Sequence, residues 1–181
     1  MSLSRRSILK GAATTAALTV APMIMGAGHG KPKVVVVGGG FGGAICAKYI
    51  RRFYPAREVT LIEPNATYVT CPFSNLVIAG LQDIDFISYD YNTLASSYGV
   101  SVSEDSVSTI NDAASTVTLA SGSSLSFDRL VLSPGIDFRA NAIEGYSPDD
   151  ENFPHAWKGG AQTQLLRDQV NAMEDGGTVI I

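Results

Sequence analysis

The chain has 181 residues, of which 45% are hydrophobic and 17% charged, as expected for a globular protein of one domain or slightly more. The formal net charge is −4 and there is no basic stripe, so we expect no nucleic-acid partner. The two histidines and two cysteines leave little for a metal site, and neither cysteine lies in a CxxC or CxxCH spacing. We therefore expect neither a metal site nor a covalent haem on this chain.

Residues 1–30 are predicted to be an export signal rather than part of the fold. Arg5 and Arg6 precede an uncharged apolar stretch, residues 11–25, that is too short and interrupted to span a bilayer as a stable helix. A positive start, a short apolar segment and small residues are typical of a removable signal, and the paired arginines indicate the twin-arginine type. We expect a periplasmic protein without stable membrane insertion; the alternative is a disordered basic N-terminus.

A predicted strand over residues 33–37 leads directly into a glycine-rich turn. The strand is a continuous β-branched run, which is typical of a strand buried on both faces. The GxGxxG spacing is met by Gly38 for the tight turn, Gly40 for approach of a pyrophosphate, and Gly43 for close packing of helix and strand. The whole candidate turn comprises Gly38, Gly39, Gly40, Phe41, Gly42 and Gly43.

The elements after the turn complete the pattern of a dinucleotide-binding unit. Apolar residues at helical spacing predict a helix over residues 44–54, whose N-terminus favours phosphate groups. A second strand over residues 58–62 ends at Glu63, which is followed by Pro64. An acid at this place can bind ribose hydroxyls and disfavours a 2′-phosphate, so NADP is not expected. The alternative is a glycine-rich turn without a ligand.

The middle of the chain predicts further strands. Residues 100–103 are expected to form a third strand, and residues 116–119 and 124–127 a hairpin around a Ser-Gly-Ser turn. Residues 128–135 form a polar lead, an apolar strand and a Pro-Gly stop. The two cysteines differ in setting: Cys46 is expected to pack within the first helix.

This arrangement resembles the FAD domain of the two-dinucleotide-binding flavoproteins, the pyridine nucleotide-disulfide reductase class. The resemblance implies an α/β, Rossmann-like FAD-binding domain with a β-meander. It also implies that Val107 lies near the adenine, and that Ser133, Pro134 and Gly135 lie near the cofactor.

The last third of the sequence predicts a change of domain. An irregular stretch over residues 136–159 is followed by an amphipathic helix over residues 162–174, and a new strand begins at residues 178–181. We expect a piece of a longer protein, with an FAD-binding domain over residues 31–160 and the incomplete start of a second nucleotide-binding domain over residues 161–181. Trp157 is expected in the core or an interface, and His155 and Lys158 are expected to brace the domain junction.

Cys71 lies in the segment Thr70-Cys71-Pro72-Phe73, shortly after the second strand. From the residues alone it can be a redox thiol, a covalent flavin anchor, or a small buried hydrophobe. A disulfide with Cys46 is a further alternative in an oxidising compartment.

The segment from Lys33 to Ile181 resembles the flavoprotein subunit of flavocytochrome c sulfide dehydrogenase. The residues that carry this are the valine-rich strand with its glycines, residues 47–50, 59–65, 70–71, 74–75, 143–147, 154–158 and 176–179. The resemblance implies that Cys71 bears an 8α-S-cysteinyl FAD, and that the enzyme oxidises sulfide to sulfur or polysulfide and passes electrons to a c-type cytochrome subunit. It places the catalytic disulfide and acid/base residues beyond Ile181.

Two other functions fit the same pattern. A sulfide:quinone oxidoreductase or an NADH dehydrogenase of this fold is the first alternative. A non-catalytic Rossmann-type binding protein is the second. Tyrosines are expected to pack rather than to take part in chemistry, among them Tyr89, Tyr91 and Tyr98.

Overall fold

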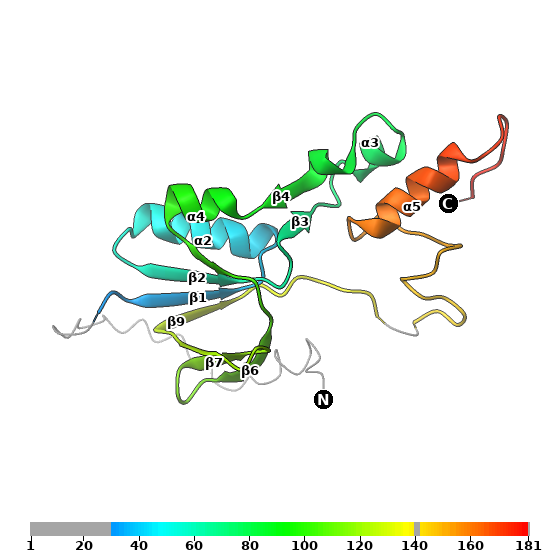
Figure 1. Ribbon diagram of the computed structural model, residues 1–181. Helices are drawn as coiled ribbons and strands as arrows, with labels where there is room; N and C mark the ends of the chain where they lie inside the picture. The colour runs from blue at the N-terminus through cyan, green and yellow to red at the C-terminus, as the bar shows by residue number, and fades with distance from the viewer. Residues whose placement is uncertain (1–29, 140–141, 181) are drawn as a thin grey trace. The chain divides into compact units, whose positions relative to one another are not determined.

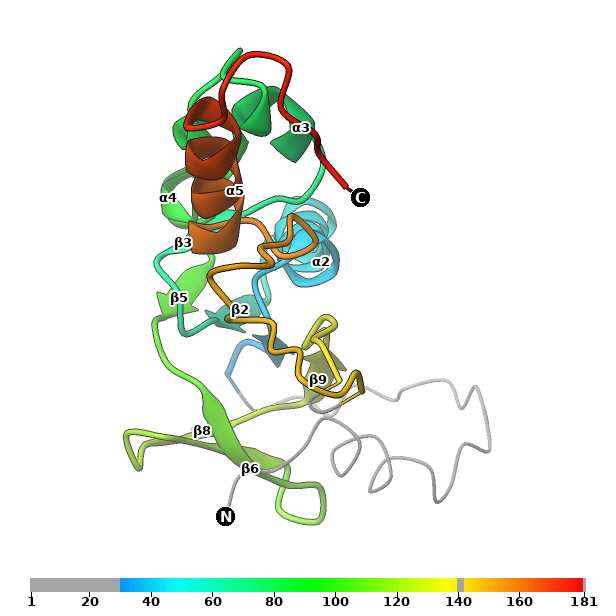
Figure 2. The same cartoon turned by 90° about the vertical axis from the view of Figure 1, so that its right-hand side faces the viewer.

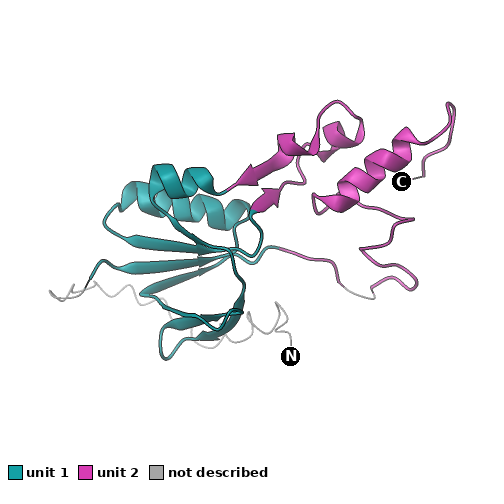
Figure 3. Ribbon diagram, viewed as in Figure 1, with its two compact units in different colours: residues 1–66, 91–135 teal, residues 67–90, 136–181 magenta. Residues whose placement is uncertain are grey.

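The computed structural model describes residues 30–139 and 142–180, so the predicted export signal, except for its last residue, lies outside the described part. The chain divides into two compact units (Figure 3). Unit 1 comprises residues 1–66 and 91–135, and unit 2 comprises residues 67–90 and 136–181. Each unit is described by itself below.

Unit 1 is built around a four-stranded parallel sheet (Figure 1). Its strand order is β5-β2-β1-β9, with β1 paired to β2 on one side and to β9 on the other. The β-branched residues of β1 suit this central place, because a strand flanked on both edges and covered on both faces is buried over most of its length, as Val34, Val35 and Val36 are. The strands are β1 (Lys33–Val37), β2 (Glu58–Ile62), β5 (Ser101–Ser103) and β9 (Arg129–Leu132).

Two different layers cover the faces of this sheet, as Figures 1 and 2 show. Helices α2 (Phe41–Phe53) and α4 (Asn92–Tyr98) lie on one face. A three-stranded antiparallel meander lies on the other, and its Val117 and Leu119 pack against Val35 and Ile62 in one buried cluster. The meander strands are β6 (Val107–Asn111), β7 (Thr116–Leu119) and β8 (Ser124–Ser126).

Unit 2 is smaller and less regular. Strands β3 (Thr67–Val69) and β4 (Ser88–Asp90) pair antiparallel, and helix α5 (Ala161–Asn171) packs against the short helix α3 (Ser74–Ile78). A 3₁₀ turn, η1 (Ile84–Ile87), leads into β4.

The predicted α/β class and the β-meander are both present, but several boundaries were wrong. Helix α2 begins at Phe41 rather than residue 44, because Gly42 and Gly43 lie inside its first turn. Helix α5 ends at Asn171, three residues early. Residues 178–180 form no strand, since no other strand in the described residues pairs with them. Trp157 is 75% exposed, so the core placement was wrong, and a place in an interface stays a prediction.

Candidate dinucleotide-binding site

The glycine-rich turn lies where the order of the parallel strands reverses. From β1 the chain moves outward to β2 and then β5, and it returns to pair β9 with the opposite edge of β1. The carboxyl ends of β1 and β9 therefore lie side by side, and the Ser133 N–H donates to the Val37 carbonyl at 2.8 Å. In open α/β sheets this reversal point is where nucleotides bind.

Two of the three motif glycines are required by close backbone contacts. Gly38 has φ +96°, and a Cβ atom there would collide with the Ser133 carbonyl oxygen. A Cβ atom on Gly43 would collide with the Gly38 carbonyl oxygen. These collisions are with backbone atoms that cannot swing away, so the turn accepts only glycine at both positions.

The N-terminus of α2 is open to an anion. Gly40 is its N-cap residue, and no side chain of the described residues caps the helix by a hydrogen bond. The first turn carries no acid, whereas Arg51 and Arg52 lie in the last turn. The first N–H groups of a helix lack partners within it and carry the positive end of its dipole. This end of α2 therefore suits a phosphate group.

Glu63 is held in place beside the turn. Its Oε2 accepts a hydrogen bond from the Gly39 N–H at 2.8 Å, and its Oε1 accepts from the Asn65 N–H at 3.1 Å and the Asn65 Nδ2 at 2.7 Å. Oε1 already accepts two hydrogen bonds, whereas Oε2 accepts one and keeps a second lone pair, so Glu63 can still accept a hydroxyl donor. The half-buried Glu63 side chain therefore lies beside the dinucleotide turn, and its binding of ribose hydroxyls stays a prediction.

Tyr91 is the part of this site that sequence reasoning missed. Its side chain is 7% exposed, and its hydroxyl donates to the Gly39 carbonyl oxygen at 3.1 Å. Burial agrees with the packing role expected for it, but the hydrogen bond adds a role in the turn. No local pattern marks Tyr91, because its partner lies 52 residues earlier in the chain.

The other predicted site residues of unit 1 differ in burial and in their contacts. Ser133 is half-buried, and its Oγ would lie 2.7 Å from a Cβ atom on Gly42. Val107 begins β6 and packs against the buried cluster under the sheet. Five predicted site residues are exposed: Phe41, Gly42, Pro64, Pro134 and Gly135. Their roles toward a cofactor stay predictions.

Cys71 lies in unit 2, in a tight turn after β3. It is partly exposed and has a free thiol, as does Cys46. The Ser74 N–H donates to the Cys71 carbonyl at 3.0 Å, and Phe73 adopts φ +69°, a left-handed conformation that is unfavourable for a bulky residue. Just before the thiol, the Thr70 N–H donates to the Ile87 carbonyl at 2.9 Å. Neighbouring backbone thus fixes Cys71 on both sides.

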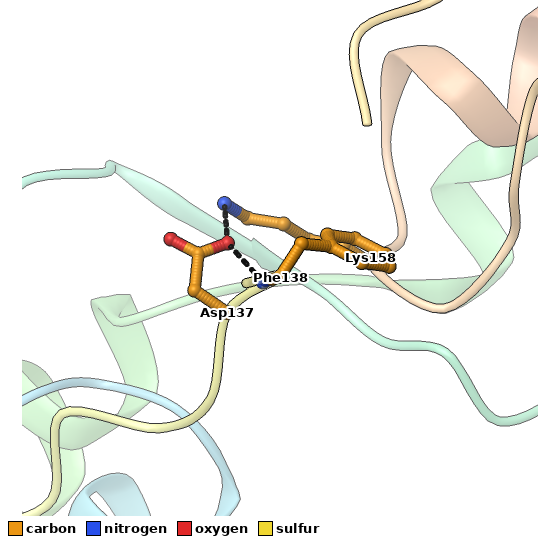
Figure 4. A network of polar contacts seen from close by, with 3 residues as sticks. All are labelled: Asp137, Phe138 and Lys158. Carbon is orange, nitrogen blue, oxygen red and sulfur yellow. Dashed lines mark hydrogen bonds and ion pairs between the residues drawn. The ribbon is translucent and has the colours of Figure 1, made fainter. Parts of the chain in front are cut away.

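The segment from His155 to Gly160 packs beside the end of β3. A Cβ atom on Gly159 would lie 2.7 Å from the Thr70 carbonyl oxygen. The His155 and Phe138 rings lie 4.3 Å apart between centroids. Figure 4 shows Asp137 Oδ1 accepting from the Lys158 ammonium at 3.4 Å and from the Phe138 N–H at 3.1 Å. His155 and Lys158 therefore brace a loop within unit 2; bracing of a domain junction stays a prediction.

Comparison with known proteins decides the family. The family model described as pyridine nucleotide-disulphide oxidoreductase matches residues 32–175. The chain belongs to this family. The family match includes the glycine turn and the Cys71 segment, and it confirms the predicted fold class.

Similarity to one named relative indicates the subgroup of the family to which the chain is related. The chain is 62% identical over 48 residues to the sulfide dehydrogenase [flavocytochrome c] flavoprotein chain of Chlorobaculum thiosulfatiphilum, a stretch that is 26% of this chain and 100% of that sequence. The predicted relationship to flavocytochrome c sulfide dehydrogenase flavoprotein chains is thereby confirmed.

Three solved structures share the fold. The sulfide:quinone oxidoreductase of Aquifex aeolicus superposes with a TM-score of 0.66 at 24% identity, over 77% of this chain and 32% of that one. A NAD-dependent persulfide reductase from A. fulgidus gives 0.65 at 22% identity, over 77% and 27%. The water-forming NADH oxidase of Lactobacillus brevis gives 0.66 at 24% identity, over 78% and 33%. The chain thus spans 27–33% of the length of these proteins.

The site residues fit a dinucleotide cofactor of this oxidoreductase family. The turn excludes side chains at Gly38 and Gly43, the first turn of α2 carries no acid, and Glu63 Oε2 supplies an acceptor for a hydroxyl group. Within residues 30–139 and 142–180, no helix is long and apolar enough to cross a bilayer. The same residues contain no cluster of three or more metal-binding side chains.

Proposed function

We propose that the chain is the FAD-binding part of a sulfide-oxidising flavoprotein. Its glycine turn, the α2 N-terminus and Glu63 would hold the diphosphate and adenosine ribose of FAD. The bound flavin would supply two-electron oxidation with one-electron release. The observation that carries the sulfide assignment is the 62% identity to the flavoprotein chain of a flavocytochrome c sulfide dehydrogenase.

The wider assignment follows from the same relative. The enzyme would oxidise sulfide to sulfur or polysulfide and transfer electrons to a c-type cytochrome subunit, the partner implied by the relative's name. The protein would be periplasmic, exported through the twin-arginine signal proposed for residues 1–30. The catalytic disulfide and acid/base residues would lie outside this sequence.

Cys71 would bind the flavin covalently through its 8α-methyl group. The thiol is free and partly exposed, and its turn is fixed by hydrogen bonds on both sides. Cys46 lies within α2 of unit 1 and is proposed only to pack. The two thiols therefore give a matched pair for testing the link.

The covalent link is tested by acid precipitation of the complete gene product. We expect flavin colour to stay with the polypeptide in the wild type and in Cys46→Ala, and to pass into the supernatant in Cys71→Ala. Release of all flavin from the wild type would refute the covalent link while leaving FAD binding intact. Retention in Cys71→Ala would assign the link to another residue.

The substrate and acceptor are tested by steady-state assays on the same protein. We expect sulfide to reduce cytochrome c rapidly and a soluble quinone slowly. Preference for the quinone would make the protein a sulfide:quinone oxidoreductase, and preference for NADH over sulfide would make it an NADH dehydrogenase. A purified product that binds no flavin would favour a non-catalytic binding protein.

A further inference from the structure

We propose that Tyr91 is a positioning residue for the dinucleotide turn: its hydroxyl fixes the Gly39–Gly40 peptide so that the Gly40 N–H is available to a diphosphate. The inference rests on the proposed FAD site and adds a residue that lies far from the motif in sequence.

The Gly39 peptide groups are held on both sides. The Tyr91 hydroxyl donates to the Gly39 carbonyl at 3.1 Å, and the Gly39 N–H donates to Glu63 Oε2 at 2.8 Å. Gly39 is buried, and a Cβ atom on it would collide with the Tyr91 hydroxyl and lie 2.9 Å from Glu63 Cγ. Gly39 is therefore packed tightly between these two side chains.

Because the peptide bond is planar, the hydrogen bond to the Gly39 carbonyl also sets the direction of the Gly40 N–H. The carbonyl of Gly39 and the N–H of Gly40 belong to one trans peptide, in which the two groups point in opposite directions. Because Tyr91 holds the carbonyl, the Gly40 N–H points away from the Tyr91 hydroxyl. Gly40 is the N-cap residue of α2, so its N–H joins the donors at the helix start.

Tyr91 is itself well fixed. The residue is 7% exposed, and its backbone carbonyl accepts a hydrogen bond from the Ala95 N–H at 3.1 Å at the start of α4. A buried ring on a helix start loses little further freedom when its hydroxyl forms a hydrogen bond. Loss of the hydroxyl would leave the Gly39 carbonyl without this donor and allow the peptide to rotate.

The test measures binding of ADP and adenosine to the full chain freed of flavin, in a Cys71→Ala background that prevents a covalent link, with and without Tyr91→Phe. A hydrogen bond of this kind contributes about 0.5–1.5 kcal/mol, so we expect ADP binding to weaken roughly two- to tenfold. Adenosine, which lacks the diphosphate, should bind equally well to both proteins. Tyr98→Phe, on the same helix, is the matched control and should leave both affinities unchanged.

Each outcome decides a separate point. Equal ADP affinity in the flavin-free protein with and without Tyr91→Phe, or equal weakening of ADP and adenosine, would overturn the positioning role. Failure of the flavin-free Cys71→Ala protein to bind either ADP or FAD would instead overturn the proposed function. If the protein with Tyr91→Phe does not fold, the Gly40 amide resonance of the flavin-free Cys71→Ala protein decides: it should move on addition of ADP but not of adenosine, and no movement with ADP would overturn the proposal.

Discussion

Unit 1 and unit 2 each contain a tight turn after a strand, and the two turns are fixed in different ways. The turn after β1 has a glycine, Gly38, at φ +96°, whereas the turn after β3 has Phe73 at φ +69°. A positive φ is favourable for glycine but unfavourable for phenylalanine. A turn of the first kind can be recognised in a sequence, whereas the second depends on contacts from distant segments.

The largest expected effect comes from Gly38→Ala. The added methyl group collides with the Ser133 carbonyl and also requires a positive φ, so the free energy of unfolding should fall by roughly 2–5 kcal/mol and FAD binding should be lost. Chemical denaturation and flavin content measure these effects. Gly122→Ala is the matched control, since Gly122 has φ +89° but open space around it; a loss of only about 1–2 kcal/mol and full FAD binding are expected there. Equal losses in the two variants would contradict the steric account.

Gly159→Ala should produce the next largest effect, confined to the Cys71 turn. Its methyl group would lie 2.7 Å from the Thr70 carbonyl and displace the backbone next to Cys71. We expect a loss of roughly 1–3 kcal/mol in stability. The fraction of flavin retained after acid precipitation should also fall, while total FAD bound stays near the wild-type value.

The control for this variant is Gly80→Ala, also in unit 2. Gly80 has φ +70° and nothing within 4 Å of an added Cβ atom, so strain is introduced without crowding. An equal fall of covalent flavin in both variants would mean that general destabilisation of unit 2, rather than displacement of Thr70, is responsible.

Substitutions of Phe73 measure the strain in this turn. The exposed ring contacts Phe86 edge-to-face, with centroids 6.2 Å apart, and any replacement by a smaller residue loses that contact. Asparagine tolerates the left-handed conformation, whereas β-branched valine does not. We expect Phe73→Asn to be more stable than Phe73→Val by about 1 kcal/mol in chemical denaturation. No difference would show that the turn relaxes to negative φ.

The smallest effect concerns Asp105, which joins β5 to the meander. Hydrogen bonds from Ser121 and from the Ser106 N–H hold the pKa of its carboxyl below the ordinary 3.8. A lowered pKa contributes stability above pH 3.8 that is lost as the pH falls through the folded-state value. Asp105→Asn should therefore be less stable than wild type at neutral pH, and the gap should narrow below about pH 4 in denaturation curves. A constant gap would contradict this role.

The sequence was informative where local backbone requirements decide the structure. The β-branched run before Gly38, the glycine spacing and the acid after β2 predicted the parallel sheet and the turn, because each follows from neighbouring residues. Tyr91 was missed because its contact with Gly39 depends on how α4 begins after β4. The strand expected at residues 178–181 was wrong in its described part, since a strand also needs a partner.

Unit 2 was harder to predict for a physical reason. Its short elements have weak periodicity, and its contacts join residues far apart, such as Arg167 and Asp83 at 3.1 Å. The Cys71 segment could be named from its resemblance to a family, but the conformation of Phe73 and the packing of Gly159 could not.

Binding of FAD by the complete gene product tests the central claim most directly. We predict that purified wild-type protein contains close to one FAD per chain and that Gly38→Ala contains none while Gly122→Ala is fully loaded. A colourless wild-type protein that takes up no added FAD, or a fully loaded Gly38→Ala, would contradict the account.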